Sequence, residues 1–196
     1  MARLAKGERR EELVVEAAAR AISELGVGNV RIQDIAERAD MRPGHVSYYF
    51  PSKDTLLQLA IRRSEQLFID RSRAALAEIT DPVLRLRELI SVASAKGPRD
   101  EGWMLWLQVW ASGVSDAPLT EEHQGLDQRW FELLVEVIEY GQAQGVFHPE
   151  NVSDAAEIIS ALIDGLSVQV TIGGGRIDRE RLLQLCAITC ERLLGA

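Results

Sequence analysis

Apolar residues recur at helical spacing along almost the whole chain of 196 residues. Near the start they form one stripe, made by Val14, Ala17, Ala18, Ala21, Ile22 and Leu25. Steps of three and four residues place side chains on one face of a helix, whereas a half-buried strand alternates apolar and polar residues. No alternating stretch longer than a few residues occurs in the sequence. The pattern therefore predicts an all-α fold.

Glycine, proline and capping residues divide this pattern into about nine helices. Gly26 follows the first stripe and tolerates the left-handed geometry beyond a helix end. Asp81 with Pro82, and later Asp178, are typical of helix starts, because a carboxylate caps free N–H groups and proline suits the first turn. The expected helices cover 7–25, 32–39, 43–49, 53–79, a segment from 82, a segment within 97–113, a segment ending near 145, 154–172 and 178–194.

The charge is distributed unevenly along the chain. The net charge of −8 argues against nucleic-acid binding. Residues 1–63, however, carry 11 Lys and Arg against 9 Asp and Glu, whereas residues 64–196 carry 11 against 21. A cationic front third on an acidic body suggests that one end meets a polyanion. The start lacks the apolar run of a signal peptide, and only two cysteines are present, which fits a reducing cytoplasm.

Residues 32–50 contain two short helical segments separated by three residues. Their apolar positions are Ile32, Ile35, Ala36, Val46 and Phe50. Two short helices joined by such a turn form a helix-turn-helix. The second segment has few apolar positions, and Gly44 weakens it by about 1 kcal/mol relative to Ala. Its polar side chains suit a helix that lies in the major groove of DNA. A tight helical hairpin in an ordinary bundle would give the same spacing.

The stretch IQDIAERADMRPGHVSYYFPSKDTLL resembles the DNA-binding domain of the TetR family. The matching positions are Ile35, Ala36, Ala39, Gly44, Tyr49, Phe50, Lys53 and Leu56, and the Ser-x-Tyr-Phe form at 47–50 is most similar to the BetI-type branch. The resemblance covers residues 8–60. It implies a helix-turn-helix domain at 1–52 and a helical ligand-binding and dimerisation domain at 53–196. The implied function is a cytoplasmic transcriptional repressor, without a cofactor or metal, that binds palindromic operator DNA as a homodimer and is released by a small effector.

Ten residues are expected on the DNA face. They are Arg31, Gln33, Arg42, Pro43, Gly44, His45, Ser47, Tyr48, Tyr49 and Lys53. The guanidinium of Arg42 fits the O6 and N7 acceptors of guanine. Tyr49 and Lys53 resemble the family's phosphate contacts. His45 could equally be a solvent-exposed helix residue.

Three positions depart from the family's pattern. Arg31 and Arg42 stand where the family usually has capping Ser or Thr, and Asp40 stands where it usually has Gly. Asp tolerates the left-handed turn better than most residues. A missing cap could cost about 1 kcal/mol. Both arginines could instead contact DNA.

Three of the four tryptophans share one helical face, at Trp103, Trp106 and Trp110. Leu107 joins this stripe. The stripe could be plain core, or it could line a ligand pocket, because such pockets are largely apolar and aromatic. Trp130 and Phe131 are candidates from the next helix. The resemblance implies a small effector, and its BetI-type form points to an organic cation such as choline, which aromatic faces attract.

The helix from residue 154 is apolar nearly all round, so we expect it to be buried on two sides. Its second side and the last helix are predicted to meet a second copy of the chain. The predicted interface residues are Ile158, Leu162, Leu166, Leu182, Leu185 and Cys186. The two cysteines, Cys186 and Cys190, are interpreted as small apolar residues.

Two other function classes fit a helical chain of this kind. A di-iron carboxylate enzyme needs Glu-x-x-His pairs. Neither His123 nor His148 has Glu three residues before it, and no nucleophile or phosphate-loop motif occurs in the sequence. A DNA-binding architectural protein without a ligand is the second alternative. The tryptophan stripe argues weakly against it.

Overall fold

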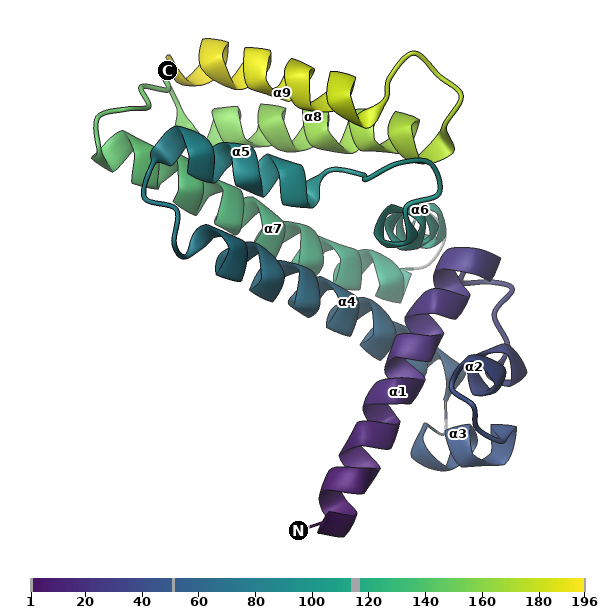
Figure 1. Cartoon of the computed structure of the whole chain (residues 1–196). Coiled ribbons are helices and arrows are strands. Elements are labelled where there is room, and N and C mark those ends of the chain that lie inside the picture. Colours follow the sequence, from purple (N-terminus) through teal and green to yellow (C-terminus); the bar gives the residue numbers. More distant parts are fainter. Residues whose placement is uncertain (1, 51, 114–116, 196) are drawn as a thin grey trace. The chain divides into compact units, whose positions relative to one another are not determined.

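The computed structural model describes the backbone of residues 2–50, 52–113 and 117–195, and side chains within 9–50, 52–112, 125 and 127–195. The described backbone forms nine α-helices and no strand (Figure 1). These helices are α1 Ala2–Leu25, α2 Ile32–Arg38, α3 Pro43–Tyr49, α4 Lys53–Leu76, α5 Pro82–Ala93, α6 Glu101–Gly113, α7 Ala117–Ala143, α8 Val152–Ile172 and α9 Arg179–Leu194. The predicted all-α fold is confirmed.

The chain divides into two compact units by its internal contacts. One unit comprises residues 1–67 and 104–124, and the other comprises 68–103 and 125–196. Helices α4, α6 and α7 each pass from one unit to the other. The functional boundary expected between residues 52 and 53 stays a prediction.

The first unit has its core where α1 meets α2 and α3. The apolar stripe of α1 is fully buried at Val14, Ala17, Ala18, Ala21 and Ile22, whereas Leu25 is exposed. Gly26 ends the helix with a φ of +84°. A side chain here would collide with Gln108 of α6, because an added Cβ would lie 2.7 Å from its Oε1 atom. The positive φ is what favours glycine at this position, because the end of the flexible Gln108 side chain could move aside.

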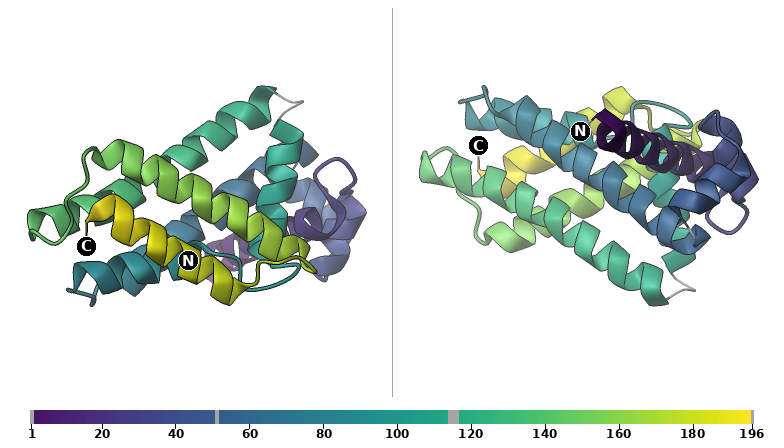
Figure 2. Two further views of the ribbon diagram at one scale, coloured as in Figure 1. Left: turned by 90° about the horizontal axis from the view of Figure 1, so that it is seen from above. Right: turned by 90° about the horizontal axis from the view of Figure 1, so that it is seen from below.

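The second unit contains α5, α8, α9 and most of α7, with α8 and α9 side by side (Figures 1 and 2). Arg179, at the start of α9, holds the loop after α5. Its guanidinium donates to the carbonyl oxygens of Ser91, Ser94 and Ala95 at 3.0, 3.1 and 2.9 Å. Because the last carbonyls of a helix have no partner inside it, this arginine satisfies the end of α5.

The predicted helix starts at Asp81 and Asp178 are confirmed by their hydrogen bonds. Their carboxylates accept from Leu84 N–H at 2.9 Å and from Arg181 N–H at 2.8 Å. Two predicted bounds were wrong. The first helix begins at residue 2, and α4 ends at Leu76, where its carbonyl accepts from the Arg85 guanidinium at 2.9 Å. A side chain from α5 thus satisfies the end of α4, which local periodicity did not show.

Helix α8 is long and apolar enough to cross a membrane by length and composition alone. Its burial pattern explains this composition differently. One face is buried in the unit at Ala156, Ile159, Ile163 and Val170. The opposite face exposes Ile158 and Ile172. A core helix of a folded domain passes the same length and composition test as a membrane span.

Candidate DNA-reading helix and effector site

Helices α2 and α3 meet through few apolar side chains. At most 1% of the surface of Ile35, Ala36 and Val46 is exposed. Between the helices, Met41 N–H donates to the Ala36 carbonyl at 2.9 Å, and Asp40 has a φ of +52°. The left-handed conformation predicted for Asp40 is confirmed. The chain therefore reverses within a turn of three residues, as a helix-turn-helix requires.

Helix α3 uses little of its surface for packing. Among its seven residues only Val46 is buried. Pro43, Gly44, His45, Ser47 and Tyr48 are exposed, Tyr48 to 81%, and Tyr49 is half-buried. The rings of the two tyrosines lie edge to face with centroids 5.4 Å apart. The structure thus leaves the predicted reading residues of this helix available to a groove of DNA.

Arg31 and Arg42 do not cap α2 and α3 with their side chains, and the first N–H groups of these two helices are accounted for in different ways. At the start of α2, the N–H of Arg31 donates to the Asp34 carboxylate at 2.8 Å, so a side chain from the first turn satisfies the backbone. At the start of α3, Pro43 has no N–H and removes one of the unpaired donors. The side chains of Arg31 and Arg42, like that of Gln33, are exposed. Neither arginine is needed as a cap, so both remain candidates for contacts with DNA.

Lys53 has a structural contact that the sequence did not reveal. Its ammonium donates to the Val30 carbonyl at 3.1 Å, which connects the start of α4 to the loop between α1 and α2. A lysine ammonium has three donors. It can therefore hold the loop and still approach a phosphate.

The predicted ligand residues occupy different surroundings. Trp103 is buried, and its indole N–H donates to the Ala93 carbonyl at 3.0 Å, which is typical of a core tryptophan. Trp106, Leu107 and Trp110 are half-buried and belong to the first unit, whereas Trp103 belongs to the second. The common pocket predicted beside these rings therefore stays a prediction.

Trp130 and Phe131 lie on α7 and are half-buried. The Trp130 indole N–H donates to the Ser160 hydroxyl of α8 at 2.8 Å. Its ring lies beside that of Phe68, with centroids 5.7 Å apart and an angle of 52° between the planes. An aromatic pair from α4 and α7 is thus fixed against α8.

Asp164 of α8 is a residue that the sequence analysis missed. Burial, and secondly the negative charge of Asp127, raise the pKa of its carboxyl from 3.8 to about 6. Such perturbed groups gather at functional sites. The sequence signal is a polar stripe in a largely apolar helix, with steps of four, three and four residues through Ser160, Asp164, Ser167 and Thr171.

Comparisons with known proteins agree with this geometry. Residues 14–60 match the N-terminal domain of bacterial regulatory proteins of the TetR family, and residues 82–195 match the C-terminal domain of the BetI-type transcriptional repressor. The second match alone covers more than half of the chain. The chain belongs to the TetR family, in its BetI-type branch. It is a DNA-binding transcriptional regulator, and the enzyme alternative is excluded by this membership.

Individual TetR relatives match over nearly the full length. The regulator BetI of Burkholderia cenocepacia is 28% identical over 198 residues, with both chains fully covered. A transcriptional regulator from Saccharomonospora viridis, crystallised in complex with choline, is 33% identical, with a TM-score of 0.85 and coverage of 96% of this chain and 98% of that one. A TetR regulator from Haloarcula marismortui is 23% identical, with a TM-score of 0.81 and coverage of 95% and 99%, and shows the same fold.

Three residues of the predicted dimer interface are buried within one chain. Leu182 and Cys186 have no exposed surface, and Leu166 has 8%. Their side chains pack in the core of this unit, and the interface itself stays a prediction. The sequence could not separate the two apolar sides of these helices. Of the other predicted residues, Ile158 is 48% exposed, and Leu162 and Leu185 are half-buried.

The two cysteines behave as the sequence predicted, as small buried side chains. Neither forms a disulfide, and both are buried. Burial raises the pKa of the Cys186 thiol to about 11, and burial followed by the charges of Cys186 and Glu191 raises that of Cys190 to about 12. Since the thiolate is the reactive form, both thiols are unreactive at neutral pH.

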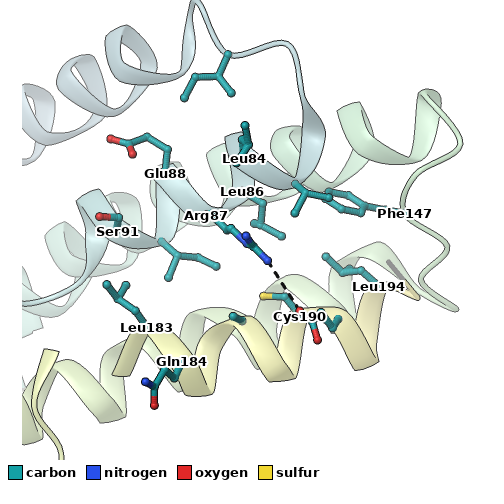
Figure 3. Close-up of a pocket in the computed structure, with 15 residues that line it drawn as sticks. Leu84, Leu86, Arg87, Glu88, Ser91, Phe147, Leu183, Gln184, Cys190 and Leu194 are labelled. Atoms are coloured by element: carbon teal, nitrogen blue, oxygen red, sulfur yellow. Dashed lines mark ion pairs between the residues drawn. The ribbon is translucent and has the colours of Figure 1, made fainter. Parts of the chain in front are cut away.

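A groove that the sequence did not predict lies between α5 and α9 (Figure 3). It measures about 750 Å³, and its lining includes Leu86, Ile90, Phe147 and Leu194. The Arg87 guanidinium lies 3.9 Å from the Glu191 carboxylate across it. None of the predicted ligand residues lines this groove.

Proposed function

We propose that this TetR regulator acts as a homodimeric repressor that leaves its operator when it binds a small organic cation. The observation that carries the proposal is the 33% identical regulator that was crystallised with choline and matches 96% of this chain. A shared fold at this identity favours a related ligand chemistry, although function belongs to sites rather than to folds. The aromatic residues Trp130 and Phe68 support this chemistry, because aromatic faces attract cations. A DNA target would place the protein in the cytoplasm.

The proposed dimer uses the outer faces of α8 and α9. The apolar residues exposed there are Ile158, Ile172 and Ile188, at 48, 72 and 42%. Between them, Ala161 and Gly165 are exposed, and small residues allow two helices to approach closely. A second copy would cover this surface on both chains, as a two-fold axis requires.

The proposed mechanism depends on the two reading heads of the dimer. Heads on one face of DNA must contact half-sites about 34–36 Å apart, which is one helical turn. An effector that favours a different separation prevents both heads from binding together. By linkage, operator DNA must then weaken effector binding by the same factor as the effector weakens DNA binding.

The test begins with the operator. Sequencing of DNA fragments selected by the purified protein should return a palindromic site. Fluorescence anisotropy with a labelled copy of this site should then fall as choline is added, and choline should bind less tightly when unlabelled operator is present. If neither choline nor any other organic cation releases the operator, the effector part of the proposal is wrong. A non-palindromic site bound by a monomer would remove the dimer part.

A further inference from the structure

Helices α7 and α8 are held in one register by the bond between Trp130 and Ser160, whose atoms are 2.8 Å apart. The two helices follow each other in the chain and run in opposite directions (Figure 1). One turn earlier on α7 is Asp127, and one turn later on α8 is Asp164. Residues separated by three or four positions lie on the same face of a helix. The register therefore brings these two carboxylates to the same level, next to the aromatic pair.

The environment of Asp164 is unusual for a carboxylate. Its side chain is half-buried, and the charge that acts on its pKa is that of Asp127, which is also negative. Within the described parts of the chain, Asp164 has neither a hydrogen bond nor an ion pair. A charge that is partly removed from water and has no partner costs free energy. A positive ligand would remove both penalties at once, because it would neutralise the carboxylate and screen it from Asp127.

We propose that Asp164 holds the charged head of a cationic effector, with the rings of Trp130 and Phe68 as its apolar wall. This inference rests on the proposed function and names the residue that selects the ligand's charge. A quaternary ammonium has no N–H to donate, so it is held by opposite charge and by aromatic faces. Asp127 adds a second negative charge at the same level. The ligand class is therefore a small organic ammonium ion.

A residue in a ligand pocket can act through its charge or through its shape. If Asp164 acts through its charge, replacing it by Asn should weaken a cation and leave a neutral molecule of the same shape unaffected. Choline and 3,3-dimethylbutan-1-ol are such a pair, because a carbon atom replaces the nitrogen. A unit charge about 5 Å away in a partly hydrated site contributes about 10- to 100-fold in affinity.

The experiment measures both ligands by calorimetry on the full-length protein, as wild type, Asp164→Asn and Glu157→Gln. Glu157 is an exposed acid on the same helix, so its variant controls for the loss of a negative charge on α8. We expect Asp164→Asn to weaken choline by about 10- to 100-fold and the alcohol by less than about 3-fold, whereas Glu157→Gln should bind both like the wild type. Thermal unfolding of each variant establishes that it is folded.

Three results would overturn the inference. If the wild type binds choline and Asp164→Asn binds it equally well, the charge is not used, and the proposed effector stands without it. If Asp164→Asn weakens choline and the alcohol by the same factor, the residue shapes the pocket and does not select charge. If the wild type binds neither choline, tetramethylammonium nor spermidine, the inference and the cationic effector of the proposed function are both wrong.

Discussion

Helices α3 and α8 differ in how much of their surface the fold uses. Helix α3 has seven residues and buries one of them, Val46, and the others are exposed or half-buried. Helix α8 has 21 residues and buries eight of them. Its functional candidates, Asp164 and the outer residues around Ile158, lie on its remaining sides. Most of the surface of α3 is available for the proposed contact with DNA, whereas α8 combines core, proposed interface and proposed ligand site.

This difference determines what can be learned from single substitutions. Changes on α3 should alter DNA binding with little effect on stability, since its exposed side chains have few packing contacts. Changes on α8 should alter stability, assembly or ligand binding according to the side of the helix.

The largest effect is expected for Ile158→Asp combined with Ile188→Asp. These residues are 48 and 42% exposed, so the variant should still fold. Buried carboxylates on both sides of a dimer interface would lack partners, and each should cost several kcal/mol, so the dimer should dissociate at micromolar concentration. Light scattering after size-exclusion chromatography measures the mass, which should halve.

Gln144→Asp is a matched control for this variant. It adds one negative charge, against two in the double variant, at an exposed position outside α8 and α9. It should remain a dimer. A dimer that persists in the double Asp variant would exclude these two faces as the interface.

A smaller effect is expected on the stability of the ligand-free protein. The pKa of Asp164 is raised from 3.8 to about 6, so the folded state disfavours the ionised form. The free energy of unfolding should therefore fall as pH rises from about 4 to 6 and stay lower above. Asp164→Asn removes this loss. At pH about 7.5 the variant should be more stable by about 1–3 kcal/mol, since one pKa unit corresponds to about 1.4 kcal/mol.

Urea unfolding at about pH 4 and pH 7.5 measures this difference, and Glu157→Gln is again the control. The gain should be much smaller near pH 4, where Asp164 is protonated in the folded state and about half protonated in the unfolded state. A gain that is equal at both pH values would mean that packing, and not charge, causes it. A functional residue whose removal stabilises the fold is an expected cost of a ligand site.

The smallest effect is expected for Lys53→Met. The loss of its bond to the Val30 carbonyl should destabilise the protein by about 1 kcal/mol. The loss of a phosphate contact should also lower the slope of log affinity against log salt by about 1. Arg42→Ala is the comparison, because Arg42 is exposed and belongs to the same predicted DNA face. It should relax base preference without a change in unfolding temperature. If Lys53→Met changes stability but not the salt slope, Lys53 is only a structural residue.

The helix-turn-helix could be predicted from the sequence because its functional residues are local. Its turn, buried positions and reading side chains all lie within residues 32–53, at spacings fixed by helix geometry. The same holds for the caps at Asp81 and Asp178. Where a contact joins distant segments, as between Lys53 and Val30, the sequence predicted only the DNA role of the residue.

The helices, the family and the position of the predicted reading helix could be inferred from the sequence, because they depend on local spacing and on a short motif. Which side of each apolar helix forms the core depended on the tertiary contacts. The tertiary structure buried Leu182 and Cys186 within one chain and left Ile158 and Ile188 exposed. It also placed Asp164 near Asp127 and the ring of Trp130 against Ser160. Burial and charge pairing depend on which segments meet in space, and a helical period fixes only which residues share a face.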